Sequence, residues 1–322
     1  MQYVVYGAGA IGGVVGARLH QGGQRVTLIA RGTHLDAVRR HGLQLEAPGE
    51  SITLAIPVVG DPAELSWGTE TVVLLAVKGQ DTDAALRALA RVALPTTTVV
   101  CMQNGVENER RAIRVFPNTY GMCVMCPATH LEAGVVQANW SPITGMLDLG
   151  RFPHGVDDVA LEIAATLTAS TFDSRAIPDV MRWKYFKLLM NLGNALEALC
   201  GPEARTSELA GLARLEGQAS LRAAGIDVAS DEEDATRRTV VQHMAPTSKG
   251  MWSGGSSWQS LARSTGSVEA DYLNGEIVLL GRLHGVPTPV NALLQRLANQ
   301  AASNGTPPGL LSVDELGGML RG

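Results

Sequence analysis

Hydrophobic and polar positions alternate along the first third of the chain in a pattern that predicts strands alternating with helices. Residues 2–6 form a short β-branched and aromatic run, residues 14–21 have the periodicity of a helix, and residues 25–30 form a second strand-like run. Residues 33–40 repeat the helical pattern, and the run at 71–77 is apolar throughout, as expected for a strand buried on both faces. This alternation predicts a doubly wound, parallel α/β sheet.

The pattern changes in the second half of the chain. A helical period continues from about residue 179, interrupted by Gly and Pro, without a further series of strands. A chain of 322 residues also exceeds the ~250 residues that one hydrophobic core commonly serves. We therefore expect a Rossmann-type domain at residues 1–176 and an all-helical domain at residues 177–322. The Pro- and Gly-rich tail from Ser303 is expected to be loosely held.

Composition and charge indicate an ordinary globular protein. Hydrophobic residues make up 45% of the chain and charged residues 18%, which argues against disorder. The formal net charge is -5 and the Lys and Arg residues are scattered, so neither nucleic acid nor a membrane is an expected partner. No run reaches the ~18 apolar residues of a membrane span, and no secretory signal is recognised. We expect a cytoplasmic protein with a small-molecule partner.

The cysteines and histidines do not predict a metal or disulfide site. Four cysteines in a chain of this length are too few for a disulfide framework. Cys123 and Cys126 form a C-x-x-C pair, but no second pair accompanies them, and extended backbone at residues 121–127 would point them to opposite faces. Packing is the favoured interpretation, over metal binding or redox chemistry. The seven histidines are dispersed without ligand spacing, so no metal is expected.

A glycine-rich segment, GAGAIG at residues 7–12, carries the clearest functional signal. It directly follows the first predicted strand and opens the first helix, as a dinucleotide-binding turn does. In that interpretation Gly7 makes the tight turn, Gly9 lets the backbone approach a pyrophosphate, and Gly12 allows close packing of helix on strand. The alternative is a purely structural glycine turn. The predicted cofactor-binding residues are Gly7, Ala8, Gly9, Ala10, Ile11 and Gly12.

Three polar residues follow predicted strands, at the sheet edge where α/β proteins bind ligands. The second strand ends with Ala30 and Arg31, where an NAD-binding protein would usually place Asp or Glu. NADP(H) is therefore favoured, because Arg can contact a 2′-phosphate. Lys78 and Asn104 follow later strands and are expected to reach cofactor or substrate. The alternatives are exposed side chains for Arg31 and Lys78, and a turn role for Asn104.

A helix in the second half combines apolar residues with polar ones at helical spacing. In the segment WKYFKLLMNLGN at residues 183–194, Lys187, Asn191 and Asn194 occupy positions i, i+4 and i+7. These intervals place an ammonium group and two amides on one helix face, directed toward a shared space. The alternative is an exposed lysine with locally bonded asparagines.

Taken together, these segments resemble the ketopantoate reductase family (2-dehydropantoate 2-reductase). The matching pieces span nearly the whole chain in the order of the family, which is far more specific than any one motif. The resemblance implies a Rossmann domain that binds NADPH and a helical domain that closes over a 2-oxo acid, and it is compatible with a homodimer. The pieces are GAGAIG at 7–12, AR at 30–31 followed by GTHL, VK at 77–78, QNG at 103–105, KLLMN at 187–191, and SS…E at 256–269 followed by DYLNG.

The resemblance also implies catalytic and cofactor-binding roles. Lys187 would be the general acid that protonates the carbonyl oxygen of the substrate as hydride arrives. Glu269 would contact the cofactor and help to orient the lysine, although by itself it resembles a surface charge on a helix. Lys78 and Asn104 would line the nicotinamide side, where Asn104 would also meet the substrate. Lys184 is a less favoured alternative for the catalytic lysine.

The resemblance assigns the substrate to three residues and also shows departures from the family. Asn191 and Asn194 would hold the hydroxyl and oxo groups, and Ser257, by itself a loop serine, would hold the carboxylate. The family often places its second asparagine eight residues after the lysine, where this chain has Ala195. After Ser257 the chain continues with Trp258, unlike the common family pattern, so the pocket wall is expected to differ.

The favoured hypothesis is NADPH-dependent reduction of 2-dehydropantoate to pantoate. Fold analogy does not fix a substrate, so reduction of another branched 2-oxo acid is a second hypothesis. A non-catalytic NADP-binding regulator is the third, and the shared face of the lysine and asparagines argues against it.

Overall fold

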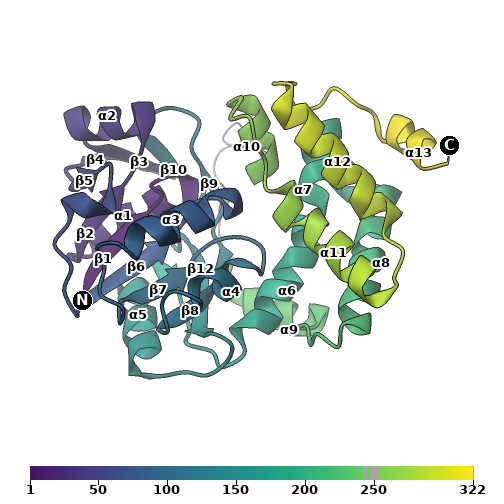
Figure 1. Ribbon diagram of the computed structural model, residues 1–322. Coiled ribbons are helices and arrows are strands. Elements are labelled where there is room, and N and C mark those ends of the chain that lie inside the picture. The colour runs from purple at the N-terminus through teal and green to yellow at the C-terminus, as the bar shows by residue number, and fades with distance from the viewer. Residues whose placement is uncertain (242–244, 247–253, 322) are drawn as a thin grey trace. The chain divides into compact units, whose positions relative to one another are not determined.

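A computed structural model describes residues 1–241, 245–246 and 254–321 of the chain. It contains two compact units (Figure 1). The first unit holds the main sheet, and the second is helical. The division falls later than the predicted boundary after residue 176, and one later segment belongs to the first unit. The first unit is Met1–Lys184 with Asp231–Trp252, and the second is Tyr185–Ser230 with Ser253–Gly322.

An eight-stranded sheet forms the centre of the first unit. Its strands are β1 (Gln2–Tyr6), β2 (Arg25–Ile29), β5 (Val58–Val59), β6 (Thr71–Leu75), β7 (Thr98–Cys101), β8 (Thr119–Met125), β12 (Gly145–Arg151) and β13 (Phe172–Asp173). They are ordered β13-β12-β8-β7-β6-β1-β2-β5. The run from β8 to β5 is parallel and has the Rossmann strand order, whereas β12 pairs antiparallel with β8. The predicted doubly wound fold is confirmed.

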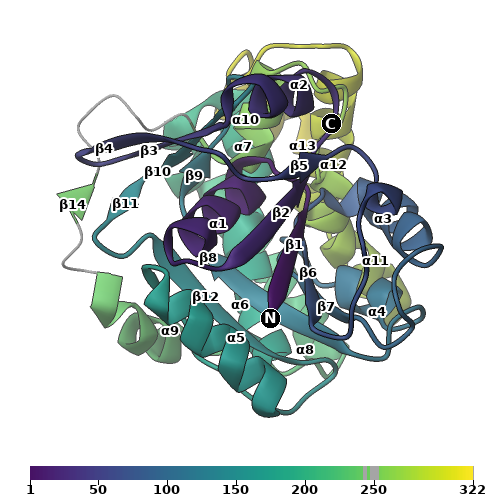
Figure 2. The same cartoon turned by 90° about the vertical axis from the view of Figure 1, so that its left-hand side faces the viewer.

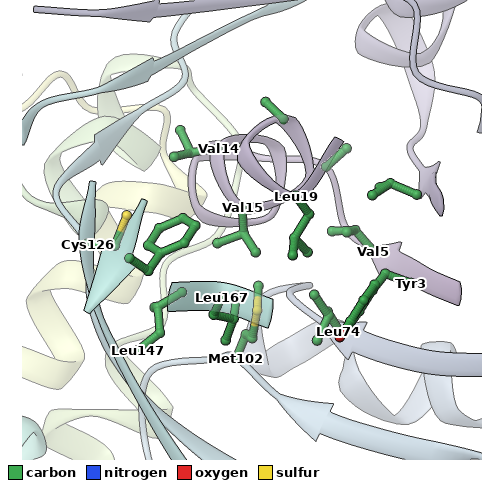
Figure 3. Packing of buried hydrophobic residues seen from close by; sticks show 14 of the residues in the cluster. Tyr3, Val5, Val14, Val15, Leu19, Leu74, Met102, Cys126, Leu147 and Leu167 are labelled. Atoms are coloured by element: carbon green, nitrogen blue, oxygen red, sulfur yellow. The ribbon is translucent and has the colours of Figure 1, made fainter. Parts of the chain in front are cut away.

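Helices cover both faces of this sheet because apolar side chains point alternately to either side of each strand. They are α1 (Ala10–Gln21), α3 (Thr82–Leu89), α4 (Asn108–Ala112) and α5 (Asp158–Ala169). Tyr3 and Val5 belong to the core under α1 and α5, whereas Val4, between them, belongs to the core under α3 and α4. Figure 3 shows the first of these cores, where Leu19 of α1 lies close to Val5. Burial on both faces explains the uninterrupted apolar run at β6.

A smaller sheet, which the sequence analysis did not predict, lies alongside α1 (Figure 2). Its strands are β3 (Leu43–Ala47), β4 (Glu50–Leu54), β9 (Ala128–Thr129) and β10 (Val135–Ala138), and β3 is preceded by α2 (Gly32–His41). Leu43 and Leu45 are fully buried, while Gln44 and Glu46, which alternate with them, are half-buried. This period-two pattern is that of a strand with one face on the core. The short strands β11 (Trp140–Ser141) and β14 (Ala245–Pro246) also pair.

One segment from late in the chain joins the first unit through buried ion pairs. Helix α9 (Asp231–Arg237) ends in Arg237, whose side chain is 7% exposed. Its Nε lies 2.7 Å from Asp148 Oδ2, and its Nη1 lies 2.8 Å from Asp173 Oδ2. Asp148 and Asp173 belong to β12 and β13. Paired carboxylates make burial of this guanidinium tolerable and attach α9 to the sheet edge.

The two cysteines of the C-x-x-C pair are buried in the first unit with separate neighbours. Cys123 Sγ lies 3.6 Å from the carbonyl oxygen of Trp183, and Cys126 Sγ lies 3.6 Å from that of Thr144. Neither thiol is in a disulfide. These contacts agree with the packing interpretation of both residues.

The second unit consists of helices, and none of the described helices in the chain is long and apolar enough to cross a membrane. They are α6 (Val180–Asn191), which begins in the first unit, α7 (Gly193–Cys200), α8 (Glu208–Ala223), α10 (Ser256–Ala262), α11 (Asn274–His284), α12 (Pro289–Ser303) and α13 (Val313–Arg321). Asn274 Nδ2 donates to Leu192 O and to Asn291 Oδ1, each at 3.0 Å. Asn291 in turn donates to Ala213 O at 2.9 Å, so buried amides join α8, α11 and α12.

The tail after Ser303 is more ordered than the sequence analysis predicts. Gly309 N donates to Ala198 O and Leu311 N donates to Leu199 O, each at 3.0 Å. The last carbonyl groups of a helix lack intrahelical partners, and those of α7 are satisfied in this way by the tail. Leu316 of α13 is fully buried, which fixes the final helix as well.

Candidate functional site

Four neighbouring parallel strands of the main sheet end level with one another. Tyr6 of β1 is paired with Ile29 of β2 and with Leu75 of β6, and Leu75 is paired with Cys101 of β7. The segments that leave these strands therefore begin side by side. Strand order reverses between β1 and β6, which is where doubly wound sheets bind ligands. The predicted site residues that follow are Gly7 to Gly12 after β1, Arg31 after β2, Lys78 after β6 and Asn104 after β7.

The glycine turn after β1 leaves open space at the start of α1. Gly7 has φ +108°, and a Cβ built on it would lie 2.7 Å from Val77 N, so no other residue fits there without strain. A Cβ on Gly12 would lie 2.0 Å from the Gly7 carbonyl oxygen, which explains the close approach of α1 to the turn. A Cβ on Gly9 would meet nothing within 4 Å. That space lies beside the free N–H groups of the first helical turn, which suit a phosphate group.

Ala10 and Ile11 open α1, where their N–H groups belong to this same first turn. Ala8 is buried, and its carbonyl oxygen lies 2.8 Å from His34 Nε2. The turn is therefore held by a side chain from α2 that the sequence analysis did not single out. Its only sequence signal is its position three residues after Arg31.

Arg31 is an exposed cation at the end of β2. Its side chain is 84% exposed, and its Nη2 lies 2.8 Å from Asp81 Oδ2. Asp81 closes a short 3₁₀ helix, η2 (Gly79–Asp81), which Lys78 precedes. The N–H of Asp81 donates to the carbonyl oxygen of Lys78 at 2.8 Å. An ion pair this exposed contributes only about 0.2–1 kcal/mol, so a phosphate can displace Asp81 from Arg31 at little cost.

Asn104 sits in a loop that hydrogen bonds hold in place. Gln103 Nε2 donates to Thr82 Oγ1 at 2.7 Å, and this hydroxyl donates to Asn108 Oδ1 at 2.7 Å. Asn108 Nδ2 then donates to the carbonyl oxygen of Asn104 at 3.2 Å. The chain of bonds connects α3, the loop and α4. The half-buried Asn104 side chain is therefore carried on a rigid backbone.

A buried ion pair lies directly beneath this loop. Lys184 Nζ donates to the carbonyl oxygen of Gln103 at 3.0 Å and also contacts Glu109 Oε1. The two charged side chains are 2% and 0% exposed. Burial raises the pKa of the Glu109 carboxyl, and the adjacent ammonium group opposes that shift. Burial also raises the pKa of the Cys101 thiol well above its ordinary value, and the charge of Glu109 adds to the rise.

Lys184 is thus engaged inside the first unit, which weakens its case as the alternative catalytic lysine. Glu109 was missed by the sequence analysis because a glutamate close to Glu107 and Arg110 resembles an exposed charge on a helix.

The predicted lysine and asparagine residues lie on two consecutive helices rather than one. Lys187 and Asn191 belong to α6, whereas Asn194 belongs to α7. Leu192 separates the helices but keeps helical dihedral angles, φ -60° and ψ -27°, so the interruption is short. Lys187 is half-buried, and Asn191 and Asn194 are 9% and 5% exposed. Asn191 Nδ2 has no hydrogen-bond partner among the described residues, which leaves a buried donor available to a ligand.

The start of the helix that carries Ser257 lies beside Asn194, held there by Glu197, a residue that the sequence did not mark. Glu197 of α7 is fully buried, and both of its carboxylate oxygens accept the N–H of Gly255 at 3.2 Å. Arg205 Nη1 donates to Glu197 Oε2 at 2.7 Å. A Cβ on Gly255 would lie 3.6 Å from Asn194 Oδ1. Glu197 therefore brings the start of α10, which carries Ser257, beside the predicted asparagine.

The remaining predicted residues are also less exposed than their residue types suggest. Ser257 is 3% exposed and belongs to α10 rather than to a loop. Glu269 is 8% exposed and precedes the 3₁₀ helix η5 (Ala270–Tyr272), so it is not a surface charge on a helix. Trp258 packs on Gly254, where a Cβ would lie 2.6 Å from its ring.

The fold and these residues define a class of protein in which a Rossmann-type unit is joined to a helical unit carrying buried polar residues. Comparison with known proteins identifies the family. Residues 3–153 match the family described as Ketopantoate reductase PanE/ApbA, and residues 179–302 match Ketopantoate reductase PanE/ApbA C terminal. The chain belongs to the ketopantoate reductase family and is therefore an oxidoreductase.

Relatives and solved structures match the chain along nearly its whole length. A 2-dehydropantoate 2-reductase of Pyrococcus horikoshii is 27% identical, covering 95% of this chain and 99% of its own, and one of Mycobacterium tuberculosis is 30% identical, covering 93% and 97%. A PanE/ApbA family ketopantoate reductase of Ralstonia eutropha superposes with a TM-score of 0.78 at 28% identity, covering 95% and 99%. A D-mandelate dehydrogenase with NADH and anilino(oxo)acetate has the same fold, with a TM-score of 0.81 at 23% identity, covering 95% and 100%.

Proposed function

We propose that this chain reduces 2-dehydropantoate to pantoate, with NADPH as the hydride source and Lys187 as the proton donor. The observation that carries the proposal is the family match along both parts of the chain. Two relatives matched over more than nine-tenths of this chain bear the name of this reductase, which supports the substrate. The geometry of the two units supports the division of roles among residues.

Groups of the first unit support NADPH as the cofactor. The open space at Gly9 and the first turn of α1 suit the pyrophosphate, and the exposed Arg31 suits the 2′-phosphate. Lys78 and Asn104 follow the strands on the other side of the switch point, where they would line the nicotinamide end. When bound, NADPH supplies the hydride that reduces the substrate.

The second unit supplies polar groups for the substrate. The unpartnered Nδ2 of Asn191 can donate to its hydroxyl or oxo group, and Asn194 and Ser257 lie near one another for the remaining polar atoms. As hydride adds to C2 of the oxo acid, negative charge develops on the carbonyl oxygen. The Lys187 ammonium group stabilises that charge and transfers its proton to it, and Glu269 helps to orient the lysine.

A Lys187→Ala variant tests the proton donor. We expect the Kd of NADPH to stay unchanged and kcat to fall about 10²–10⁴-fold, the usual contribution of a positioned general acid. Added methylamine should restore part of the turnover of this variant, because it replaces the missing ammonium group. If Lys187→Ala retains wild-type turnover without added amine, Lys187 is not the proton donor.

The unusual residue after Ser257 favours a second candidate, a reductase of another 2-oxo acid. Trp258 packs on Gly254 at the start of α10 and so adds a bulky ring close to a proposed substrate-binding serine. Initial rates of NADPH oxidation with a panel of 2-oxo acids separate the candidates. Highest kcat/KM for 2-dehydropantoate supports the main proposal, whereas preference for another acid supports the second. A non-catalytic regulator would oxidise NADPH with none of them.

A further inference from the structure

The imidazole of His34 connects three segments of the first unit. His34 lies in the first turn of α2, three residues after Arg31. Its Nε2 lies 2.8 Å from the carbonyl oxygen of Ala8 in the glycine turn. Its Nδ1 accepts the backbone N–H of Gly134, which precedes β10 in the small sheet, at 2.9 Å. One side chain therefore joins the glycine turn, α2 and the small sheet.

The partners of the ring fix its protonation state. A backbone N–H can only donate, so Nδ1 of His34 must be the unprotonated nitrogen that accepts from Gly134. Nε2 of the neutral ring then carries the proton and donates it to Ala8 O, which can only accept. Both of these hydrogen bonds are satisfied by this one tautomer.

The bond to Ala8 O controls the orientation of one peptide group in the glycine turn. The peptide joining Ala8 and Gly9 is planar and trans, so its carbonyl oxygen and its N–H point in opposite directions. Holding the oxygen toward His34 therefore directs the Gly9 N–H away from it. The N–H of Ala8 donates to Ile29 O at 3.3 Å, so the backbone is held on both sides of this residue.

The far side of the imidazole rests on a rigid support. The carbonyl oxygen of Gly134 accepts the N–H of Gln44 in β3 at 2.9 Å, so the residue that donates to His34 is itself held in the small sheet. The ring of His130 lies 4.4 Å from that of His34, and its Nδ1 lies 2.9 Å from Val135 O. The small sheet therefore fixes the position of the His34 ring, and the ring in turn holds the glycine turn.

We propose that His34 is a positioning residue for the dinucleotide: it orients the Ala8–Gly9 peptide toward the pyrophosphate and ties that turn to the segment carrying Arg31. This inference rests on the proposed nucleotide site and names a residue on which its affinity depends. His34 does not touch the reacting atoms, so its effect falls on binding and not on the chemical step.

Two substitutions separate the hydrogen bond from the volume of the side chain. His34→Leu removes the donor to Ala8 O, and we expect the Kd of NADPH to rise about tenfold, as for the loss of one well-placed interaction. His34→Gln keeps an N–H donor that can reach the same oxygen, so most of the affinity should return. His41→Leu, at the exposed end of the same helix, is the matched control and should bind as the wild type does.

The measurements are the Kd of NADPH by fluorescence titration of the full chain, kcat at saturating NADPH, and the melting temperature. We expect kcat to change less than about twofold while Kd moves, because an orienting group acts on the bound population and not on the reaction. A merely structural role would lower the melting temperature of His34→Leu and leave the Kd of the folded protein unchanged.

Three outcomes overturn the inference. They are wild-type affinity in His34→Leu, an equal loss in His34→Leu and His34→Gln, and a loss of kcat in place of affinity. Failure of the wild type to bind either NADPH or NADH overturns the proposed function together with the inference. If the wild type binds NADPH and His34→Leu binds it with the same affinity, only the inference about His34 is overturned.

Discussion

Replacing Lys184 by methionine tests whether the buried lysine supports the structure or the chemistry. Methionine has nearly the same length and fills the same space, so the main change is the loss of the ammonium group. Glu109 then keeps a carboxyl group in a site that is 0% exposed, without its cation. Breaking a buried ion pair in this way costs about 3–5 kcal/mol. The carbonyl oxygen of Gln103 loses a donor as well, which adds about 1 kcal/mol.

A second substitution on the opposite side of the pair should recover much of this loss. In Lys184→Met/Glu109→Gln the buried carboxyl is replaced by a neutral amide, which removes the uncompensated charge. We expect the double variant to be more stable than Lys184→Met by about 2 kcal/mol, within the range of couplings between contacting residues. Simple addition of the two single effects would contradict the charge pairing.

Urea denaturation provides the free energy of unfolding, with an unchanged m-value as the sign that only stability has moved. Steady-state kinetics on the same preparations decide the catalytic question. Lys184→Met should keep turnover within about tenfold in the folded protein, whereas Lys187→Ala loses about 10²–10⁴-fold. The reasoning is refuted if Lys184→Met costs less than about 1 kcal/mol. It is equally refuted if folded Lys184→Met loses turnover as completely as Lys187→Ala does.

Three further predictions concern cofactor selection, substrate binding and acid stability. Asp81→Asn should lower the Kd of NADPH about three- to tenfold, because a carboxylate beside the proposed 2′-phosphate site is removed. Arg31→Ala should raise the Kd of NADPH, and equal changes in the Kd of NADH would contradict both predictions. Glu197→Gln should raise KM for the 2-oxo acid about tenfold at unchanged NADPH affinity, since its charge holds Gly255 at the start of α10; an unchanged KM would count against this. Burial tends to raise the pKa of Asp157, but hydrogen bonds from Arg151, the N–H of Ala160 and Tyr120 outweigh this effect and lower the pKa. The Asp157 carboxylate therefore stabilises the fold at pH values above the ordinary Asp pKa of about 3.9. That stabilisation is lost as the pH falls through the lowered pKa of the folded state. Asp157→Asn should be about 1 kcal/mol less stable than the wild type at pH 7, and denaturation experiments should show this difference disappearing toward pH 2. A stability difference that persisted at pH 2 would contradict the role of the Asp157 carboxylate.

The parts of the fold that the sequence predicts have a local cause. The strand at residues 2–6, the turn at Gly7 and the helix after it are each specified by neighbouring residues, through β-branched character, a positive φ and helical period. The uninterrupted apolar run of β6 likewise reflects burial on both of its own faces. The small sheet was not predicted, although LQLEA at residues 43–47 has a clear period of two. Its strand β3 forms a local hairpin with β4, but β3 also pairs with β10, almost one hundred positions away, and no local pattern indicates that pairing.

The parts that were not predicted depend on contacts between distant segments. Arg237 belongs to an acidic, polar stretch of sequence, and only the carboxylates of Asp148 and Asp173 make its burial possible. For the same reason the division of the chain differs from the predicted one, because that stretch returns to the first unit. The tail after Ser303 is ordered by carbonyl groups at the end of α7, and a sequence rich in Gly and Pro does not reveal such acceptors.

In the candidate site, the residues proposed to contact ligands differ in the same way from the residues that support them. Glycine turns, strand-end residues and the lysine–asparagine spacing have recognisable motifs, so the sequence alone suggests them as candidates. His34, Lys184 and Glu197 instead bind backbone groups, namely Ala8 O, Gln103 O and Gly255 N, and each of those groups adjoins or lies close to a predicted site residue.

A backbone acceptor or donor has no residue-specific identity, so nothing in the sequence marks its partner. Such supporting residues should nevertheless differ from ligand-binding ones by experiment. We expect His34→Gln to preserve function because it keeps the donor to Ala8 O, whereas Lys187, as the proposed proton donor, should tolerate no neutral amide. Rescue by glutamine at position 34, together with failure of glutamine at position 187, would distinguish a residue that positions the site from one that performs its chemistry.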